Sequence, residues 1–422
     1  MAQRAGRRDE VSGRSGMLMG HPTLNANVRA AGDALAGAGL LAEFHTTLDT
    51  TALLRAFGPS ALGGAFTRRS LSDALHLLTK THPTPELRRL ATQRFGVGIT
   101  PGVYPVDASS FAVDRAVRAR ITSQTAGVYA YEDSALFSFQ KAAEVGIPRI
   151  YDLPIGYWRA GDEIYAEEAE LQPGWAGTIP ARAIANREER QERKDSEISL
   201  ATRIIVASSF TLQTLSQFSG SLPDLAPIVS IPYGVPTVAD APNVSSAGPV
   251  RVLYVGGLTQ RKGISYLFDA ARALGSAVEL TVVGRRVGES VARDSALSSV
   301  RWIESLPHQQ VLRLMRESDV LVLPSLFEGF GLVLTEAMSQ GTPIIATDHT
   351  AAPDLITDGL EGWIVPLRSS DAIAERLSRL VEDIDLRNAM KQAALDRAAQ
   401  LSWSAYRDGI VATVREALEV GR

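Results

Sequence analysis

Short apolar runs and longer segments with a helical period alternate along most of this chain. Runs such as 17–20, 41–46 and 250–255 have the length of buried strands. Between them, segments such as 27–38, which ends at Gly39, space their apolar residues as helices do. A strand followed by a helix and another strand is the repeating unit of a parallel sheet, so the pattern predicts an α/β protein.

The alternation continues on both sides of one break. Residues 238–248 are mostly small and include Pro242, Ser245, Ser246 and Gly248, which predicts a linker. We therefore expect a tail at 1–16, a first domain at 17–240, a second domain at 241–400 and a final helix within 401–422 that packs on either domain. Each domain is expected to be a doubly wound, Rossmann-like sheet, and ligands bind such sheets at the carboxyl ends of the strands. The other predicted strands are 127–131, 148–153, 203–207, 278–283 and 300–303, and the other predicted helices are 134–145, 186–201, 264–274, 309–317 and 405–418.

Composition narrows the class of protein. The 422 residues are 45% hydrophobic and 21% charged with a net charge of −4, which is typical of a folded domain and argues against general nucleic-acid binding. The absence of cysteine excludes disulfides and thiolate chemistry. No apolar run reaches the roughly 18 residues of a membrane span, so we expect a cytoplasmic protein with at most peripheral membrane contact.

The densest chemical signal is a pair of glutamates around a glycine-rich turn. Glu328 precedes the turn, and Glu336 follows it within an apolar segment that is predicted to be helical, between the predicted strands 319–324 and 343–346. A buried carboxylate needs hydrogen-bond donors, and ligand hydroxyls can supply them. The unpaired N–H groups at the start of this helix favour an anion such as phosphate.

These segments resemble a known family. The sequences VGGLTQRKG at 255–263, PSLFEGFG at 324–331 with Glu336, and GTPII at 341–345 are similar to family 4 retaining glycosyltransferases of the GT-B fold. The resemblance is specific over about 250–366. In the first half, HPTLNANVR at 21–29 and YDLPIGYW at 151–158 are similar to one subset of such enzymes.

The resemblance implies a GT-B fold, in which two Rossmann-like domains face each other across a cleft, and it implies roles for single residues. Glu328 would contact the donor sugar near the reacting carbon, and Glu336 would bind the ribose hydroxyls. Lys262 and Arg261 would stabilise the diphosphate, although the position at which the family usually has an arginine is Gly257 here. The donor sugar and diphosphate would be held by Gly329, Phe330, Gly331 and Leu332.

The first domain departs from the family at the strand end where many members have a histidine near the donor. The chain has Arg149-Ile-Tyr-Asp152 there, so Tyr151 or Asp152 would face the cleft instead. His21 follows the first predicted strand and is a candidate for ligand contact, with a structural role as the alternative.

The implied reaction moves a sugar from a nucleoside diphosphate donor to an acceptor hydroxyl of a glycan, lipid, protein or small molecule, with retention of configuration. We expect no metal and no cofactor, because the cations and the helix terminus would stabilise the leaving diphosphate. Two alternatives stay open. One is an epimerase or phosphorylase on the same fold, and the other is a protein that binds sugar nucleotides or glycans without catalysis.

Two further signals have structural interpretations. Asp383 and Asp385 match the Asp-x-Asp pattern of metal-dependent transferases, but we interpret the pair as a helix cap, with Asp385 capping a helix that begins at Leu386. Between 68 and 94 basic residues exceed acidic ones, which would suit a membrane surface or an acidic acceptor, although a solvated helix face is the commoner reason. The residues are Arg68, Arg69, Lys80, Arg88, Arg89 and Arg94 against Asp73 and Glu86.

Overall fold

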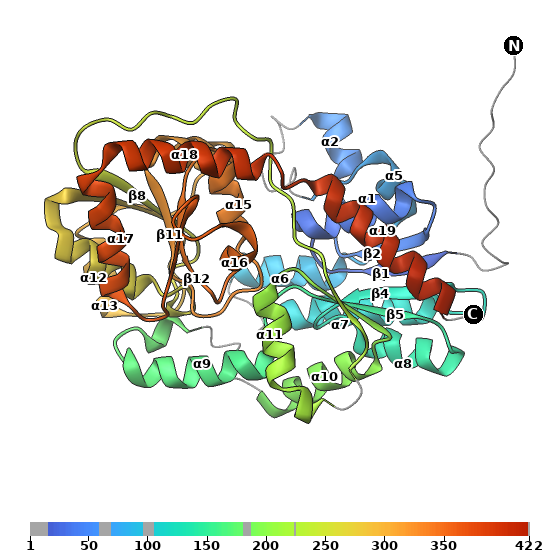
Figure 1. Ribbon diagram of the computed structural model, residues 1–422. Helices are drawn as coiled ribbons and strands as arrows, with labels where there is room; N and C mark the ends of the chain where they lie inside the picture. Colours follow the sequence, from blue (N-terminus) through green and yellow to red (C-terminus); the bar gives the residue numbers. More distant parts are fainter. Residues whose placement is uncertain (1–15, 59–68, 96–104, 180–186, 223–224, 421–422) are drawn as a thin grey trace, which may run out of the picture. The chain divides into compact units, whose positions relative to one another are not determined.

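The structure is a computed structural model that describes residues 16–58, 69–95, 105–179, 187–222 and 225–420 (Figure 1). Its strands form two parallel sheets, which confirms the predicted α/β class. The chain packs as two compact units. The first contains the residues up to Asp152, Arg193–Ile204 and the residues from Ile410 on, and the second contains Leu153–Glu192 and Ile205–Gly409.

The first sheet has seven strands in the order β3-β2-β1-β4-β5-β6-β7. Its strands are β1 (Met17–Gly20), β2 (Leu41–Thr46), β3 (Thr79–Thr81), β4 (Gly127–Tyr131), β5 (Arg149–Leu153), β6 (Arg203–Val206) and β7 (Ile228–Ser230). The helices between them are α1 (Ala26–Gly37), α2 (Thr51–Phe57), α5 (Asp73–Leu78), α6 (Thr84–Phe95), α7 (Pro105–Arg120), α8 (Leu136–Val145), α9 (Trp158–Leu171), α10 (Arg187–Leu200) and α11 (Ser209–Gln217).

The second sheet has six strands in the order β10-β9-β8-β11-β12-β13. Its strands are β8 (Val250–Val255), β9 (Val278–Val283), β10 (Arg301–Ile303), β11 (Val320–Leu323), β12 (Ile344–Thr347) and β13 (Gly362–Val365). Its helices are α12 (Ile264–Leu274), α13 (Val291–Leu297), α14 (His308–Glu317), α15 (Leu332–Ser339), α16 (Ala352–Leu355), α17 (Ser370–Glu382) and α18 (Ile384–Ala398). The chain then ends in α19 (Trp403–Val420).

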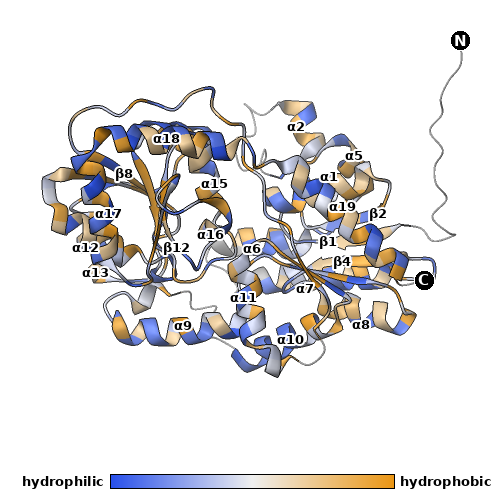
Figure 2. Cartoon of the chain, in the orientation of Figure 1, coloured by the Kyte–Doolittle hydropathy of each residue, from blue (hydrophilic) through white to orange (hydrophobic). Residues whose placement is uncertain are grey.

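Helices cover both faces of the second sheet. In Figure 1, α12 and α17 lie on one side of its strands and α15 on the other. The central strands β11 and β12 are almost entirely apolar and have no exposed side chain, as expected for a parallel sheet covered on both faces. Figure 2 shows these strands as apolar and the covering helices as divided between apolar and polar residues.

The predicted elements agree closely with the observed ones, but the packing of α9 was not apparent from the sequence. Sequence order places α9 in the first predicted domain, whereas the helix belongs to the second compact unit. There Phe327 packs against Ala160 of α9 and against Phe210 of α11. Two other predictions are affected: the tail 1–16 lies outside the described residues except for Gly16, and the linker 238–248 forms neither helix nor strand.

The helix cap near Asp383 is a correction. The helix α18 begins at Ile384, and Asp383 accepts the N–H of Leu386 at 2.8 Å. The capping residue is therefore Asp383 and not Asp385, because the helix starts two residues earlier than predicted. Among the described residues, no helix is long and apolar enough to cross a membrane.

A buried ion pair fastens the linker and α18 to the second sheet. The carboxylate of Asp319 lies 2.9 Å from the ammonium of Lys391, and both side chains are 1% exposed. Arg251 and Ser245 also donate to this carboxylate, at 2.9 Å and 2.7 Å. Burial would raise the pKa of Asp319, but the hydrogen bonds from Arg251 and the charge of Lys391 hold it well below its usual range.

We predict that Asp319→Asn destabilises the second unit by about 3–5 kcal/mol, because the buried ammonium of Lys391 loses its charge partner. Thermal unfolding should show a midpoint several degrees lower. The matched control is Asp269→Asn, which breaks the exposed pair with Arg272 and should change stability little. Equal midpoints for the two variants would contradict this account of the buried pair.

Candidate functional site

The main candidate site lies where the strand order of the second sheet reverses. The strands β8 and β11 are neighbours there. After β8 the next strand, β9, lies on one side of this pair, and after β11 the next strand, β12, lies on the other. The loops that follow the two strands, 256–263 and 324–331, therefore start side by side at the carboxyl edge. Open parallel sheets bind ligands at such a point.

A tight turn brings the first loop against the second. Residues Gln260–Lys262 form a single 3₁₀ turn that ends at Gly263, whose φ is 63°. A Cβ at Gly263 would lie 1.9 Å from the carbonyl oxygen of Pro324, so only glycine fits in this position. The N–H of Leu326 donates to the carbonyl of Arg261 at 2.9 Å, which joins the two loops.

This contact places two cations on one carboxylate. Lys262 Nζ is hydrogen-bonded to Glu328 Oε2, and Arg261 Nη1 lies 3.2 Å from the same oxygen. The side chains of Glu328, Lys262 and Arg261 are only 14%, 13% and 21% exposed. The structure therefore brings together the three residues that were predicted to act at the reacting centre.

Charge and burial oppose each other in this cluster. Burial would raise the pKa of Glu328, but Lys262 and Arg261 together lower it below its ordinary value. Burial lowers the pKa of Lys262, which Glu328 only partly offsets. Burial would also lower the pKa of Arg261, but the charge and hydrogen bond of Glu328, together with Tyr165 and Tyr254, raise it above its ordinary value. The carboxylate stays ionised at neutral pH and lies against two basic side chains.

A second network, which the sequence did not reveal, holds the turn that carries the cations. Glu168 of α9 is 1% exposed and accepts hydrogen bonds from Gln260 Nε2 at 2.7 Å and from Tyr266 at 2.9 Å. Arg368 donates to the other oxygen of Glu168 at 2.7 Å. The N–H of Gln260 also donates to Thr178 at 2.8 Å. Gln260 adjoins Arg261, so the network fixes the backbone from which both cations extend.

The backbone after Glu328 approaches another chain segment closely. A Cβ at Gly329 would lie 1.8 Å from the carbonyl oxygen of Pro154, so a side chain cannot be accommodated there. The carbonyl of Gly329 accepts hydrogen bonds from the hydroxyls of Ser208 and Thr211, the latter at 3.2 Å. These contacts orient the peptide groups that lead into α15.

The start of α15 has the backbone donors that an anion site requires. The helix begins at Leu332, after Gly331 with a φ of 84°. The N–H groups from Gly329 to Val333 donate to no acceptor among the residues that the structure describes. Five adjacent N–H groups at a helix N-terminus favour an oxyanion. Phe330 contributes through its backbone, since its side chain is buried against Tyr233.

Glu336 lies on α15 and is separate from the cation cluster. Its side chain is 25% exposed, and His308 Nδ1 lies 3.8 Å from its Oε1. Burial raises the pKa of Glu336 to about 7. The carboxylate is thus poorly solvated and has no strong partner in the described part of the chain, which is the environment that was expected to attract ligand hydroxyls.

The two predicted residues of the first domain lie along the carboxyl edge of the first sheet. His21 follows β1 directly, and its ring meets the edge of Tyr131 with centroids 4.7 Å apart. Burial lowers the pKa of His21 to about 4. Asp152 is 2% exposed, Tyr129 donates to it at 2.7 Å, and burial raises its pKa to about 7. Their predicted contact with ligand stays a prediction.

Gly257 stands at the position where the family usually has an arginine. The carbonyl of Gly257 accepts the hydroxyl of Tyr254 at 2.9 Å, and a Cβ there would have only ordinary contacts. Among the described residues, no group of three or more His, Cys, Asp or Glu side chains is arranged to hold a metal ion.

Comparison with known proteins supports this description. Residues 239–397 match the model of the family described as "Glycosyl transferases group 1". A phosphatidyl-myo-inositol mannosyltransferase of Mycobacterium leprae is 32% identical over 189 residues, which are 42% of this chain and 50% of that protein. The amylovoran biosynthesis glycosyltransferase AmsK of Erwinia amylovora is 31% identical over 146 residues, 31% of this chain and 36% of that protein. The chain thus matches only about a third to a half of the length of these relatives.

Solved structures are similar over almost the whole chain. A sucrose-phosphate synthase from Thermosynechococcus elongatus has a TM-score of 0.63 at 18% identity and covers 96% of this chain and 100% of its own. Anabaena HepE in complex with UDP and glucose has a TM-score of 0.58 at 15% identity, with coverage of 96% and 100%. This likeness confirms the GT-B fold.

We predict that Glu336→Gln stabilises the ligand-free protein at alkaline pH. Because its pKa is raised, Glu336 contributes stability that is present at acid pH and is lost as the pH rises through 7. The non-titrating glutamine avoids this loss, which we put on the order of 1 kcal/mol. Unfolding midpoints at about pH 5 and pH 8 test this, with the exposed Glu375→Gln as control. If the unfolding midpoints of Glu336→Gln and the native protein differ by the same amount at both pH values, the prediction is wrong.

Proposed function

We propose, on the premise that residues 239–397 form a domain of the glycosyl transferases group 1 family, that this chain is a retaining glycosyltransferase. It would take a hexosyl group from a nucleoside diphosphate sugar and give it to an acceptor hydroxyl. The observation that carries the proposal is the carboxylate of Glu328 held by Lys262 and Arg261 beside the N–H groups at the start of α15, which have no acceptor among the described residues.

The difficult part of this reaction is the charge that develops on the departing diphosphate. Lys262, Arg261 and the N-terminus of α15 are preorganised donors that would stabilise this charge. These groups supply positive charge of the kind that a divalent metal brings elsewhere, so the proposal includes a metal-independent reaction. Turnover should accordingly be the same with and without a chelator.

Glu328 would orient the donor sugar through its hydroxyls. The bond between the anomeric carbon and the phosphate oxygen breaks while the bond to the acceptor oxygen forms on the same face. The acceptor proton passes to an oxygen of the leaving diphosphate, so no dedicated protein base is needed. Holding both reactants in this geometry removes a large part of the activation free energy.

Glu336 would bind the ribose of the nucleotide. A ribose has two neighbouring hydroxyls, and both can donate to one carboxylate. The raised pKa of Glu336 supports this role, because the ligand would supply the donors that the protein does not.

A melting screen against UDP, GDP, ADP, CDP and dTDP tests the nucleotide half of the proposal. A nucleotide present at a hundred times its Kd should add about 2.7 kcal/mol to stability and raise the midpoint visibly. We predict that Glu336→Gln weakens the binding of the active nucleotide about tenfold. Glu375→Gln is the control and should bind normally. If Glu336→Gln has full nucleotide affinity, the ribose assignment is wrong.

For the reaction itself, we predict that Glu328→Gln lowers turnover about a hundredfold or more, because the sugar is no longer oriented at the reacting carbon. Nucleotide affinity should change only a few-fold, since Lys262 and Arg261 are retained. Turnover is measured with the nucleotide sugar that corresponds to the base found in the screen. Conversion of the donor alone to an epimerised sugar nucleotide, followed by NMR, would favour an epimerase instead.

A further inference from the structure

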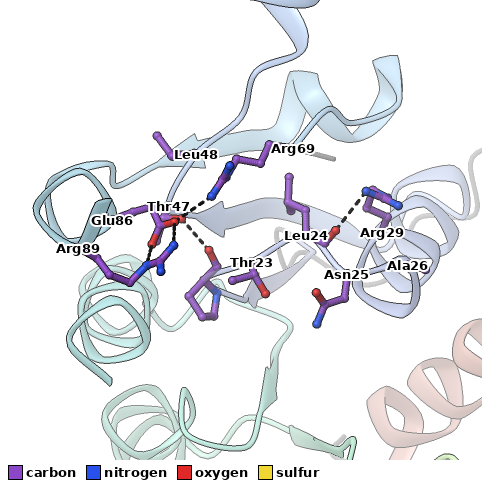
Figure 3. Close-up of a pocket in the computed structure, with 11 residues that line it drawn as sticks. Thr23, Leu24, Asn25, Ala26, Arg29, Thr47, Leu48, Arg69, Glu86 and Arg89 are labelled. Carbon is purple, nitrogen blue, oxygen red and sulfur yellow. Dashed lines mark hydrogen bonds and ion pairs between the residues drawn. The ribbon is translucent and has the colours of Figure 1, made fainter. Parts of the chain in front are cut away.

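A separate polar cavity lies in the first unit, at the carboxyl ends of β1 and β2. Its volume is about 380 Å³, which is within the range of small-molecule sites. The turn between β1 and α1 forms one wall, and α6 forms the opposite wall (Figure 3). The lining residues include Thr23, Asn25, Arg29, Thr47, Arg69 and Arg89.

The lining has an excess of positive charge. Among the residues that the structure describes, three arginines line the cavity and the only lining acid is Glu86, which leaves a net charge of +2. Arg89 donates to both oxygens of Glu86, at 2.7 Å and 2.6 Å, and Arg69 donates at 3.0 Å. Glu86 is 3% exposed and lies beneath the two guanidinium groups. It therefore fixes their positions and neutralises only part of their charge.

Arg29 adds a cation from the other side. Its guanidinium donates to the carbonyl of Leu24 at 3.1 Å, across the cavity from Arg69 and Arg89 (Figure 3). Burial lowers the pKa of Arg29 and Asp33 partly offsets this, yet an arginine keeps its charge at neutral pH. Asp33 does not line the cavity. Guanidinium groups on two sides suit an oxyanion with several oxygens, and two excess charges match a phosphomonoester at neutral pH.

Neutral polar groups line the mouth of the same cavity. Asn25 precedes α1, is exposed, and makes no side-chain cap hydrogen bond to the helix. Thr23 is also exposed. The backbone here is held in place, because Thr47 donates to the carbonyl of Pro22 at 2.6 Å. An amide and a hydroxyl next to an anion site are suited to the hydroxyls of a polyol.

This arrangement changes the interpretation of the basic stretch. A solvated helix face was the expected reason for the excess, but Arg69 and Arg89 are only 30% and 19% exposed and face a buried carboxylate. Arg88 is exposed and does not line the cavity. Arg68 and the side chain of Arg94 lie outside the described part of the chain.

We propose that this cavity binds the phosphate of a small phosphorylated polyol and that such a phosphomonoester is the acceptor of the transferred sugar. The acceptor assignment rests on the proposed function, whereas the anion site does not. Arg29, Arg69 and Arg89 bind the phosphate, and Thr23 and Asn25 contact the hydroxyl-bearing part.

Binding of inorganic phosphate to the full chain, measured by calorimetry, tests the anion site. Arg29→Gln should weaken phosphate binding about tenfold or more, because a charge-assisted hydrogen bond is lost. Arg88→Gln, one residue from Arg89 but outside the cavity, should bind phosphate normally. Glu86→Gln should tighten binding by raising the net charge of the lining, a gain that misfolding cannot produce. Equal affinity in Arg29→Gln and the native protein, or no binding at millimolar phosphate, would overturn the site.

Transfer assays with matched acceptors test the acceptor class. Glycerol 3-phosphate against glycerol, and glucose 6-phosphate against glucose, should show transfer at least tenfold faster to the phosphorylated partner. Arg29→Gln should remove this preference and leave nucleotide affinity unchanged. Equal transfer to both partners would overturn the acceptor assignment. Phosphate binding without any nucleotide binding or transfer would instead count against the proposed function and leave the anion site standing.

Discussion

The contact between Glu328 and its two cations depends on a constraint of the parallel sheet. Because β8 and β11 are neighbours at the reversal of strand order, their following loops have to leave the sheet side by side. Gly263 then permits the first loop to approach Pro324 closely enough for Lys262 to reach Glu328. The carboxylate in turn keeps two half-buried cations together that would otherwise repel each other. The strand order, the backbone of the first loop and the charges thus all favour the same contact between Glu328 and its two cations.

Much of this arrangement could be predicted from the sequence, because its causes are local. A short run such as Val320–Leu323 is buried on both faces and therefore has an uninterrupted apolar pattern. The glycine-rich turn before α15 likewise predicts the start of a helix, because the residues that form the turn are adjacent in the chain. For the same reason the bounds of β8, β9 and α12 agree with the prediction to the residue.

The rest depends on contacts between residues far apart in the chain, which no local pattern records. Glu168 resembles its exposed neighbours on α9 in sequence, yet it is buried because Gln260 and Arg368 reach it from about 90 and 200 positions away. No local pattern around Arg29 indicates a cavity, so its place beside the cavity became apparent only from the structure. The cap at Asp383 was displaced by two residues because two aspartates there offer equivalent side chains.

The place of α9 also bears on how this chain can be divided. A fragment that started at the linker would contain both sheet neighbours β8 and β11 but would lack Glu168. Gln260, Tyr266 and Arg368 would then lose a common acceptor, and the ring of Phe327 would lose the cover of Ala160. The turn that carries Lys262 is therefore held in part by residues outside the segment that matches the family.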